Sequence, residues 1–206
     1  MSDAERLALL WEGGEWDDPE IGPVVLSYRT IGDLVLPSGR IITSDPFLCQ
    51  SPPAFARAML PGTYPIRVVI ADIEETADQR VASAMLLVTD HLPVQWERAA
   101  HADGTVEPYG VDAGFAAFLD EAGLQALEAR EDDSPTYLQQ RVEEQDPHGS
   151  FGWAWLDATL DEDSRANLIA FTSGWGDGVY WAYWGLDADS NVACLMTDLG
   201  ILTRQA

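Results

Sequence analysis

The chain has 206 residues and a formal charge of -24, because 35 acidic side chains outnumber 11 basic ones, all of them arginine. This charge repels phosphate backbones and anionic membranes, which argues against direct nucleic-acid or membrane binding, and it attracts cationic proteins and metal ions. No apolar run approaches the roughly 20 residues of a membrane span, and the N-terminus has no secretory signal, so we expect a cytoplasmic protein.

The first residues predict a helix. Ser2 and Glu5 have the spacing of a capping box, and Gly13–Gly14 would end the helix. Residues Glu15–Gly22 have the composition of an acidic linker. We therefore expect an N-terminal helix and linker over residues 1–22, followed by one α+β domain over residues 23–206.

Apolar alternation then predicts strands over residues 24–30, 32–36, 40–43, 64–73, 81–89 and 94–99. Pro37-Ser38-Gly39 would form the turn of a hairpin. Ser51-Pro52-Pro53 would begin a short helix over Ala54–Leu60, because proline is tolerated in a first helical turn.

The middle of the chain predicts helices and the last third predicts strands. Asp112 is the expected N-cap of a helix whose apolar stripe includes Phe115, Phe118 and Leu119, and Gly123 would break this helix from a second piece. Another helix would run from Ser134 to about Glu144. Strands are expected over residues 151–156, 168–172, 179–184 and 192–197. This order predicts an α+β fold with a mainly antiparallel sheet, or a β-sandwich, and a few short helices.

The segment Ser173–Gly178 (SGWGDG) has three glycines in six residues, so its backbone can adopt positive φ or approach another group closely. One interpretation is a ligand or metal loop in which Asp177 supplies a carboxylate and Trp175 a platform, with Tyr180 nearby. The other is a hairpin loop in which the glycines occupy turn positions and Asp177 bonds its own backbone.

Two further patterns have structural and functional interpretations. The bulky run Tyr180–Trp184 predicts a strand covered on both faces, or a stacking platform for a sugar or a base. Asp187–Asn191 matches the opening of a calcium loop, with Asp198 at the twelfth position, but Val192 stands where such a loop needs glycine. A plain hairpin turn is therefore expected there.

Cys49 and Cys194 allow one disulfide, but two buried thiols are expected in a reducing compartment.

These motifs together resemble an uncharacterised bacterial domain-of-unknown-function family, over about residues 30 to 200. The stretches that carry the resemblance are LPSG (36–39), DP (45–46), PGTYP (61–65), WERA (96–99), VDAG (111–114), SGWGDG with Tyr180, and WGLD (184–187). SGWGDG is the most specific of them. The resemblance implies a shared fold and no established activity, and it draws attention to Asp45, Glu97, Asp112 and Asp177.

No zinc spacing, GxSxG elbow, Walker A loop or dinucleotide fingerprint is present, so enzymatic activity stays open. Three hypotheses follow. The first is an acidic binding protein, such as an immunity-type inhibitor of a cationic, nuclease-like bacterial toxin. The second is a metal-dependent hydrolase in which Asp45, Glu97, Asp112 and Asp177 hold a divalent cation. The third is a ligand-binding module built on a Trp platform at Trp175, Asp177 and Tyr180.

Overall fold

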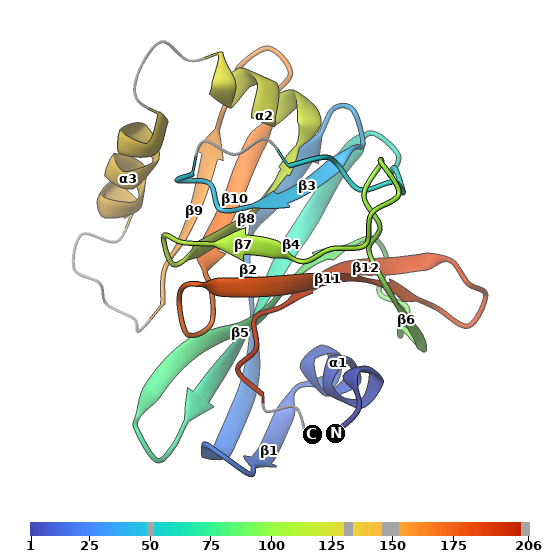
Figure 1. Cartoon of the computed structure of the whole chain (residues 1–206), viewed down its shortest axis with the longest axis vertical. Helices are drawn as coiled ribbons and strands as arrows, with labels where there is room; N and C mark the ends of the chain where they lie inside the picture. The colour runs from blue at the N-terminus through green and yellow to red at the C-terminus, as the bar shows by residue number, and fades with distance from the viewer. Residues whose placement is uncertain (49–51, 130–133, 146–152, 203–206) are drawn as a thin grey trace.

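The computed structural model describes residues 1–48, 52–129, 134–145 and 153–202, which form three helices and twelve strands (Figure 1). The helices are α1 (Asp3–Glu12), α2 (Glu121–Glu128) and α3 (Ser134–Gln145). The strands are β1 (Gly14–Asp18), β2 (Gly22–Leu36), β3 (Ile41–Ser44), β4 (Gly62–Ile73), β5 (Asp78–Leu87), β6 (Gln95–Arg98), β7 (Tyr109–Val111), β8 (Phe115–Asp120), β9 (Trp155–Thr159), β10 (Asn167–Thr172), β11 (Gly178–Leu186) and β12 (Val192–Asp198).

The strands form two sheets. The larger has the order β1-β2-β4-β5-β12-β11-β6, with β7 paired to the first residues of β11, and the smaller has the order β3-β8-β10-β9. Each pairing between these strands is antiparallel. The prediction of a mainly antiparallel α+β fold is therefore confirmed, whereas the β-sandwich alternative stays a prediction.

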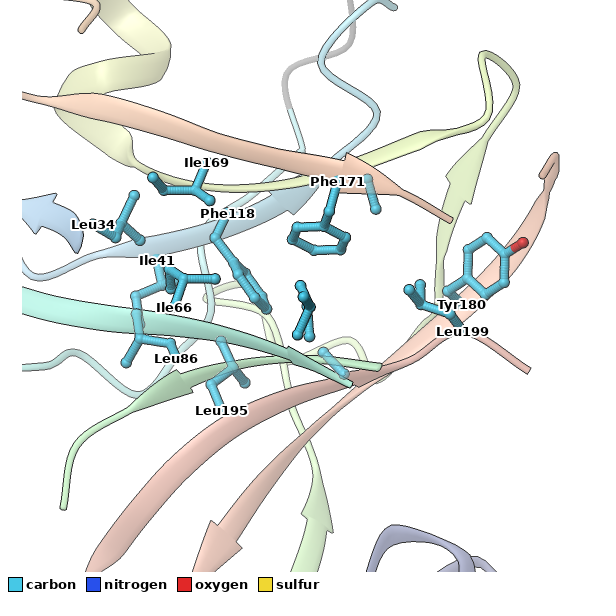
Figure 2. Packing of buried hydrophobic residues seen from close by; sticks show 14 of the residues in the cluster. Leu34, Ile41, Ile66, Leu86, Phe118, Ile169, Phe171, Tyr180, Leu195 and Leu199 are labelled. Atoms are coloured by element: carbon cyan, nitrogen blue, oxygen red, sulfur yellow. The ribbon is translucent and has the colours of Figure 1, made fainter. Parts of the chain in front are cut away.

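Side chains from both sheets share one apolar core (Figure 2). The large sheet contributes Leu34, Ile66, Leu86 and Leu195, and the small sheet contributes Ile41, Phe118, Ile169 and Phe171. The rings of Phe118 and Phe171 lie 5.5 Å apart, between their centroids. Removal of this apolar surface from water is the main force that holds the two sheets together.

Two further apolar clusters cover the outer faces of the sheets. On β8, Phe118 faces the shared core whereas Leu119 joins Leu127 of α2 and Leu138 of α3 in a cluster on the outer face of the small sheet. On the large sheet, Leu7 and Leu10 of α1 pack with buried residues of β2, β4, β5 and β12. Both sheets are thus covered on two faces, which explains why several strands have no polar side.

Helix α1 begins as the capping box predicts. The Ser2 hydroxyl accepts from the Glu5 amide at 3.3 Å, the Ser2 amide donates to the Glu5 carboxylate at 2.7 Å, and Gly13 caps the C-terminus. Arg6 of this helix is fully buried and donates to the buried Asp198 carboxylate of β12 at 2.9 and 2.6 Å. This ion pair joins the first helix to the last strand.

Three of the expected elements are wrong. The expected acidic linker over Glu15–Gly22 overlaps β1, which pairs with β2, although the domain division at residue 22 stays a prediction. Pro37-Ser38-Gly39 does not close a hairpin, because β2 and β3 belong to different sheets. The helix expected over Ala54–Leu60 is absent from the described residues of that segment, because the backbone around Phe55 pairs with the backbone around His101.

The helix expected from Asp112 is also wrong, because Phe115–Asp120 forms β8 and the true N-cap is Asp120, which accepts from the Ala122 amide at 2.8 Å. Gly123 lies inside α2 and does not break it. The helix predicted from Ser134 is confirmed as α3. The first residues of the strand expected over 151–156 lie outside the described residues, and β9 begins at Trp155.

Candidate functional site

Three loops meet where the small sheet ends, and the carboxylate of Asp45 holds two of them together. Asp45 is buried directly after β3, and its Oδ2 accepts from the amides of Asp112 and Ala113 at 2.9 and 2.8 Å. Its Oδ1 accepts from the amide of Phe47 at 2.9 Å. Asp45 therefore has a structural role, because its carboxylate accepts hydrogen bonds from backbone amides that lie far away in the sequence.

The third loop is SGWGDG, which carries the chain from β10 of the small sheet to β11 of the large sheet. The Ser173 amide donates to the Gly114 carbonyl at 3.0 Å, and the Asp177 carboxylate accepts from the Gly114 amide at 3.1 Å. The Tyr180 hydroxyl donates to the Gly176 carbonyl at 2.6 Å. The segment is thus a turn between sheets, tied to the loop that Asp45 also holds.

Gly174 is the residue on which this turn depends. Its φ is +50°, and a Cβ atom there would lie 2.2 Å from the Leu199 carbonyl oxygen. Gly176 also has a positive φ, of +110°, but a Cβ there would meet nothing within 4 Å. Close backbone approach therefore requires glycine at position 174, and turn geometry favours it at 176.

The three residues predicted as a binding platform have different environments. Trp175 is 51% exposed at the tip of the turn, and Asp177 is exposed beside it. Tyr180 is buried in the shared core, and this burial raises the pKa of its hydroxyl. Trp175 and Asp177 are therefore the predicted residues that remain exposed, although the Arg80 guanidinium lies over the Trp175 ring at 5.4 Å.

The four residues predicted to bind metal do not converge. Asp45, Asp112 and Asp177 surround the junction of the three loops, but Glu97 lies on β6 and pairs with Arg57 at 3.1 Å. Among the described residues, no group of three or more His, Cys, Asp or Glu side chains could hold a metal ion. The described geometry therefore gives no support to the metal hypothesis, which stays a prediction.

The other chemically suggestive residues are engaged in structure. Asp187 accepts from the amides of Asp189 and Asn191 at 3.0 and 2.9 Å, as expected for a hairpin turn. In the aromatic run, Trp184 faces the shared core and Tyr183 faces the α1 side, so both faces are covered as predicted. Cys194 is a free, buried thiol whose pKa is raised by burial to about 12, and Cys49 lies outside the described residues.

A groove of about 640 Å³ runs beside the SGWGDG turn. Its walls include Trp175 and Trp181, the 66% exposed Val179, and Glu20 with Ile21 from the β1–β2 turn. The groove therefore combines aromatic and aliphatic surface with a carboxylate. Patterns within one segment of the sequence do not predict it, because its residues come from three distant segments.

The β1–β2 and β4–β5 turns form what we call the acidic tip, at the lower end of the molecule in Figure 1. The β4–β5 turn contacts the start of β2 through a hydrogen bond of 3.1 Å from the Glu74 amide to the Pro23 carbonyl. Glu20, Glu74 and Glu75 are exposed on it, and Asp17 is exposed in the adjoining strand β1. The charge of each turn was visible in the sequence, but their adjacency depends on the pairing of β2 with β4.

Comparison with known proteins gives a family whose function is unknown. A family model described as a protein of unknown function, DUF4241, matches residues 34–197. No curated protein and no solved structure matches this chain. The predicted resemblance to a family of unknown function is confirmed. That the family is bacterial, and that SGWGDG is its characteristic motif, stay predictions.

In the described part of the chain, no helix is long and apolar enough to cross a membrane.

Proposed function

Because the chain belongs to the DUF4241 family, whose function is unknown, its surfaces must indicate its role, and we propose that it is an acidic binding protein for a cationic protein. The observation that carries this proposal is the contact between the acidic tip and the aromatic groove, since Glu20 belongs to both. Protein interfaces combine aromatic anchors with complementary charge at their rim.

Charge and apolar surface have separate roles in this proposal. The carboxylates of the acidic tip attract the partner over long range and accelerate association, and they lose this effect as salt is added. Trp175 and Val179 exclude water after contact and slow dissociation. The form of this function that we propose is an immunity-type inhibitor, whose partner is a nuclease-like toxin with a basic, phosphate-binding active site.

The test is binding to the product of the adjacent gene, with two variants that have equal net charge. Glu74→Lys/Glu75→Lys changes the acidic tip, and Glu162→Lys/Asp163→Lys changes an exposed turn after β9. We expect the first variant to slow association by about tenfold or more at low salt, and the second to change it much less. Stopped-flow fluorescence as a function of salt measures both rates.

A third variant separates charge from contact. Trp175→Ala should leave the association rate almost unchanged and raise the dissociation rate, because a half-exposed aromatic anchor acts after encounter. If both charge variants slowed association equally, net charge alone would be responsible and the acidic tip would have no special role. Absence of any salt-sensitive cationic partner would refute the proposed function.

A further inference from the structure

A pocket of about 420 Å³, which we call the Arg67 pocket, lies on the α1 side of the large sheet, where α1 and β5 end. Its walls combine apolar and polar side chains, among them Trp11, Pro65, Leu87, Arg67, Thr89 and Asp90. None of its wall residues belongs to the groove beside Trp175. Its volume is that of a site for a small organic molecule.

Arg67 of β4 is a partly buried cation that has no carboxylate partner among the described residues. This is unusual in the chain, because most of its described arginines pair with a carboxylate, namely Arg6, Arg40, Arg57, Arg80, Arg98 and Arg141. Taking a guanidinium out of water without a counter-charge costs free energy, and a bound anion would offset that cost.

Two aromatic rings hold the Arg67 guanidinium in place. Its Cζ lies 4.8 Å from the centroid of the Trp11 ring and 4.7 Å from that of the Tyr28 ring. Its Nη2 donates weakly to the Met85 sulfur at 3.8 Å, and its buried Nε has no partner. Nη1 has no partner among the described residues either, but unlike Nε it keeps surface that solvent can reach. The guanidinium is therefore fixed, with a free N–H group open to a ligand.

Two more hydrogen-bond donors belong to walls of the Arg67 pocket. The Trp11 indole N–H has no partner among the described residues and is accessible to solvent. The Thr89 hydroxyl accepts from the His91 amide at 3.2 Å but donates its own hydrogen to no described residue. A cation with two neutral donors suits an anion that carries several acceptor oxygens.

The surroundings of the pocket favour an anion with a single charge. Asp90 is exposed at the pocket, and it and the total charge of -24 repel a phosphate dianion more strongly than a carboxylate. A carboxylate is also planar, so its two oxygens match the fork of a guanidinium. The apolar walls, in turn, can remove a hydrocarbon body from water.

We propose that the Arg67 pocket binds an apolar monocarboxylate. The carboxylate pairs with Arg67, and the hydrocarbon body lies against Trp11, Pro65 and Leu87. The proposal is independent of the cationic partner proposed above, because the Arg67 pocket shares no residue with the acidic tip or with the groove.

The first experiment titrates the full chain with carboxylate probes at pH 7.5 and follows the NMR signal of the Trp11 indole N–H. The Trp11→Phe variant assigns this signal by its loss. The probes are phenylacetate and N-acetyl-alanyl-phenylalanine, and their neutral controls are phenylacetamide and N-acetyl-alanyl-phenylalaninamide. A saturable shift of the Trp11 signal with a carboxylate probe, but not with its amide, supports the proposal.

The two probes also distinguish the source of the carboxylate. Phenylacetate binds if the pocket takes a free small acid, and only N-acetyl-alanyl-phenylalanine binds if it takes the C-terminal residue of a peptide. Phenyl phosphate should bind at least tenfold more weakly than the carboxylate that binds. The proposal would be overturned by the absence of a saturable shift at millimolar concentrations, by equal shifts with the amides, or by tighter binding of phenyl phosphate.

A pair of variants tests the role of Arg67. Arg67→Met removes the unpaired charge and keeps apolar contact with the rings, so the melting temperature should stay close to that of the wild type while probe affinity falls tenfold or more. Arg141→Met removes one positive charge from the exposed side of α3 and should leave probe affinity almost unchanged.

Unchanged probe affinity in Arg67→Met, or equal losses in both variants, would contradict a direct contact between Arg67 and the carboxylate. The indole signals of the other tryptophans report whether each variant keeps its fold. If Arg67→Met does not fold, the probe titrations of the wild type still decide the proposal.

Discussion

At Arg6 the chain buries a guanidinium completely and pairs it with the carboxylate of Asp198. Replacement of Arg6 by alanine leaves a buried carboxylate without this cation, and we expect unfolding free energy to fall by about 3–5 kcal/mol. Urea denaturation followed by circular dichroism measures this loss.

The double variant Arg6→Met/Asp198→Leu is the matched test of the same pair. It removes both charges and keeps apolar volume, so it should recover most of the stability. Asp3→Ala removes the partly exposed second partner of Arg6 and should cost about 1 kcal/mol or less. If the double variant were as unstable as Arg6→Ala, the ion pair would stabilise the folded protein by more than the mutual neutralisation of two buried charges.

His91 should make stability depend on pH. Its Nδ1 lies 2.9 Å from the Asp187 carboxylate, and this hydrogen bond raises the pKa of the imidazole and lowers that of the carboxyl. A raised histidine pKa means that the folded protein binds the proton more tightly than the unfolded chain does. The stabilisation is therefore complete below about pH 6.5 and is lost as pH rises through the raised pKa.

Melting temperatures of the wild type and of His91→Gln, compared between pH 5 and pH 8.5, measure this effect. The advantage of the wild type should be largest near the acidic end and should disappear at the alkaline end. The histidine NMR titration of Asp187→Asn gives the control, because the pKa of His91 should return toward its ordinary value. A pKa that does not move would remove Asp187 as the cause.

At the scale of elements, the SGWGDG turn should tolerate changes at its two positive-φ glycines unequally. Gly176→Ala meets only backbone strain and should cost about 1–3 kcal/mol. Gly174→Ala adds a clash with the Leu199 carbonyl and should cost more than Gly176→Ala, or prevent folding. Urea denaturation measures the unfolding free energy of both variants. Equal losses of unfolding free energy would mean that the Leu199 carbonyl moves away from the added methyl group at little energetic cost.

Local signals in the sequence predicted some elements well. The capping box of α1 and the Ser134-Pro135 start of α3 depend on residues within one helical turn, and both helices are present. The pattern after Asp112 predicts a helix because Phe115, Phe118 and Leu119 also fit helical spacing. In β8 both faces are buried, so the alternation that identifies a half-exposed strand is missing.

The candidate site was harder to predict than the helices. Trp175 and Asp177 were singled out because glycines flank them, and the structure places both on an exposed turn. The acidic tip, the groove and the bond from Asp45 to residues 112 and 113 all depend on strand pairing across long stretches of sequence. Periodicity within a segment carries no information about such pairing.

At the scale of the whole molecule, the charge of -24 should make stability depend on salt. Like charges repel one another more in the compact state than in the unfolded chain. At 0.1 M, salt largely screens the repulsion between exposed charges that are more than about 10 Å apart. We expect the melting temperature to rise between low and moderate salt and on mild acidification, as differential scanning fluorimetry can measure. A melting temperature that falls under both conditions would contradict this.

The Glu162→Lys/Asp163→Lys variant provides the control for that measurement. Its net charge is smaller, so its melting temperature should rise less steeply with added salt. An unchanged slope would indicate that local ion pairs, and not overall repulsion, determine the salt response.

The position of β12 has a consequence for synthesis of the protein. This strand is last in chain order among the described strands, yet it lies between β5 and β11 in the large sheet, and it also supplies Asp198 to Arg6. While the ribosome is still translating the segment before Val192, β5 has a bare backbone edge on that side and α1 lacks its anchor. A nascent chain stalled at that stage should be sensitive to protease and prone to self-association, and release of residues through Asp198 should remove both properties.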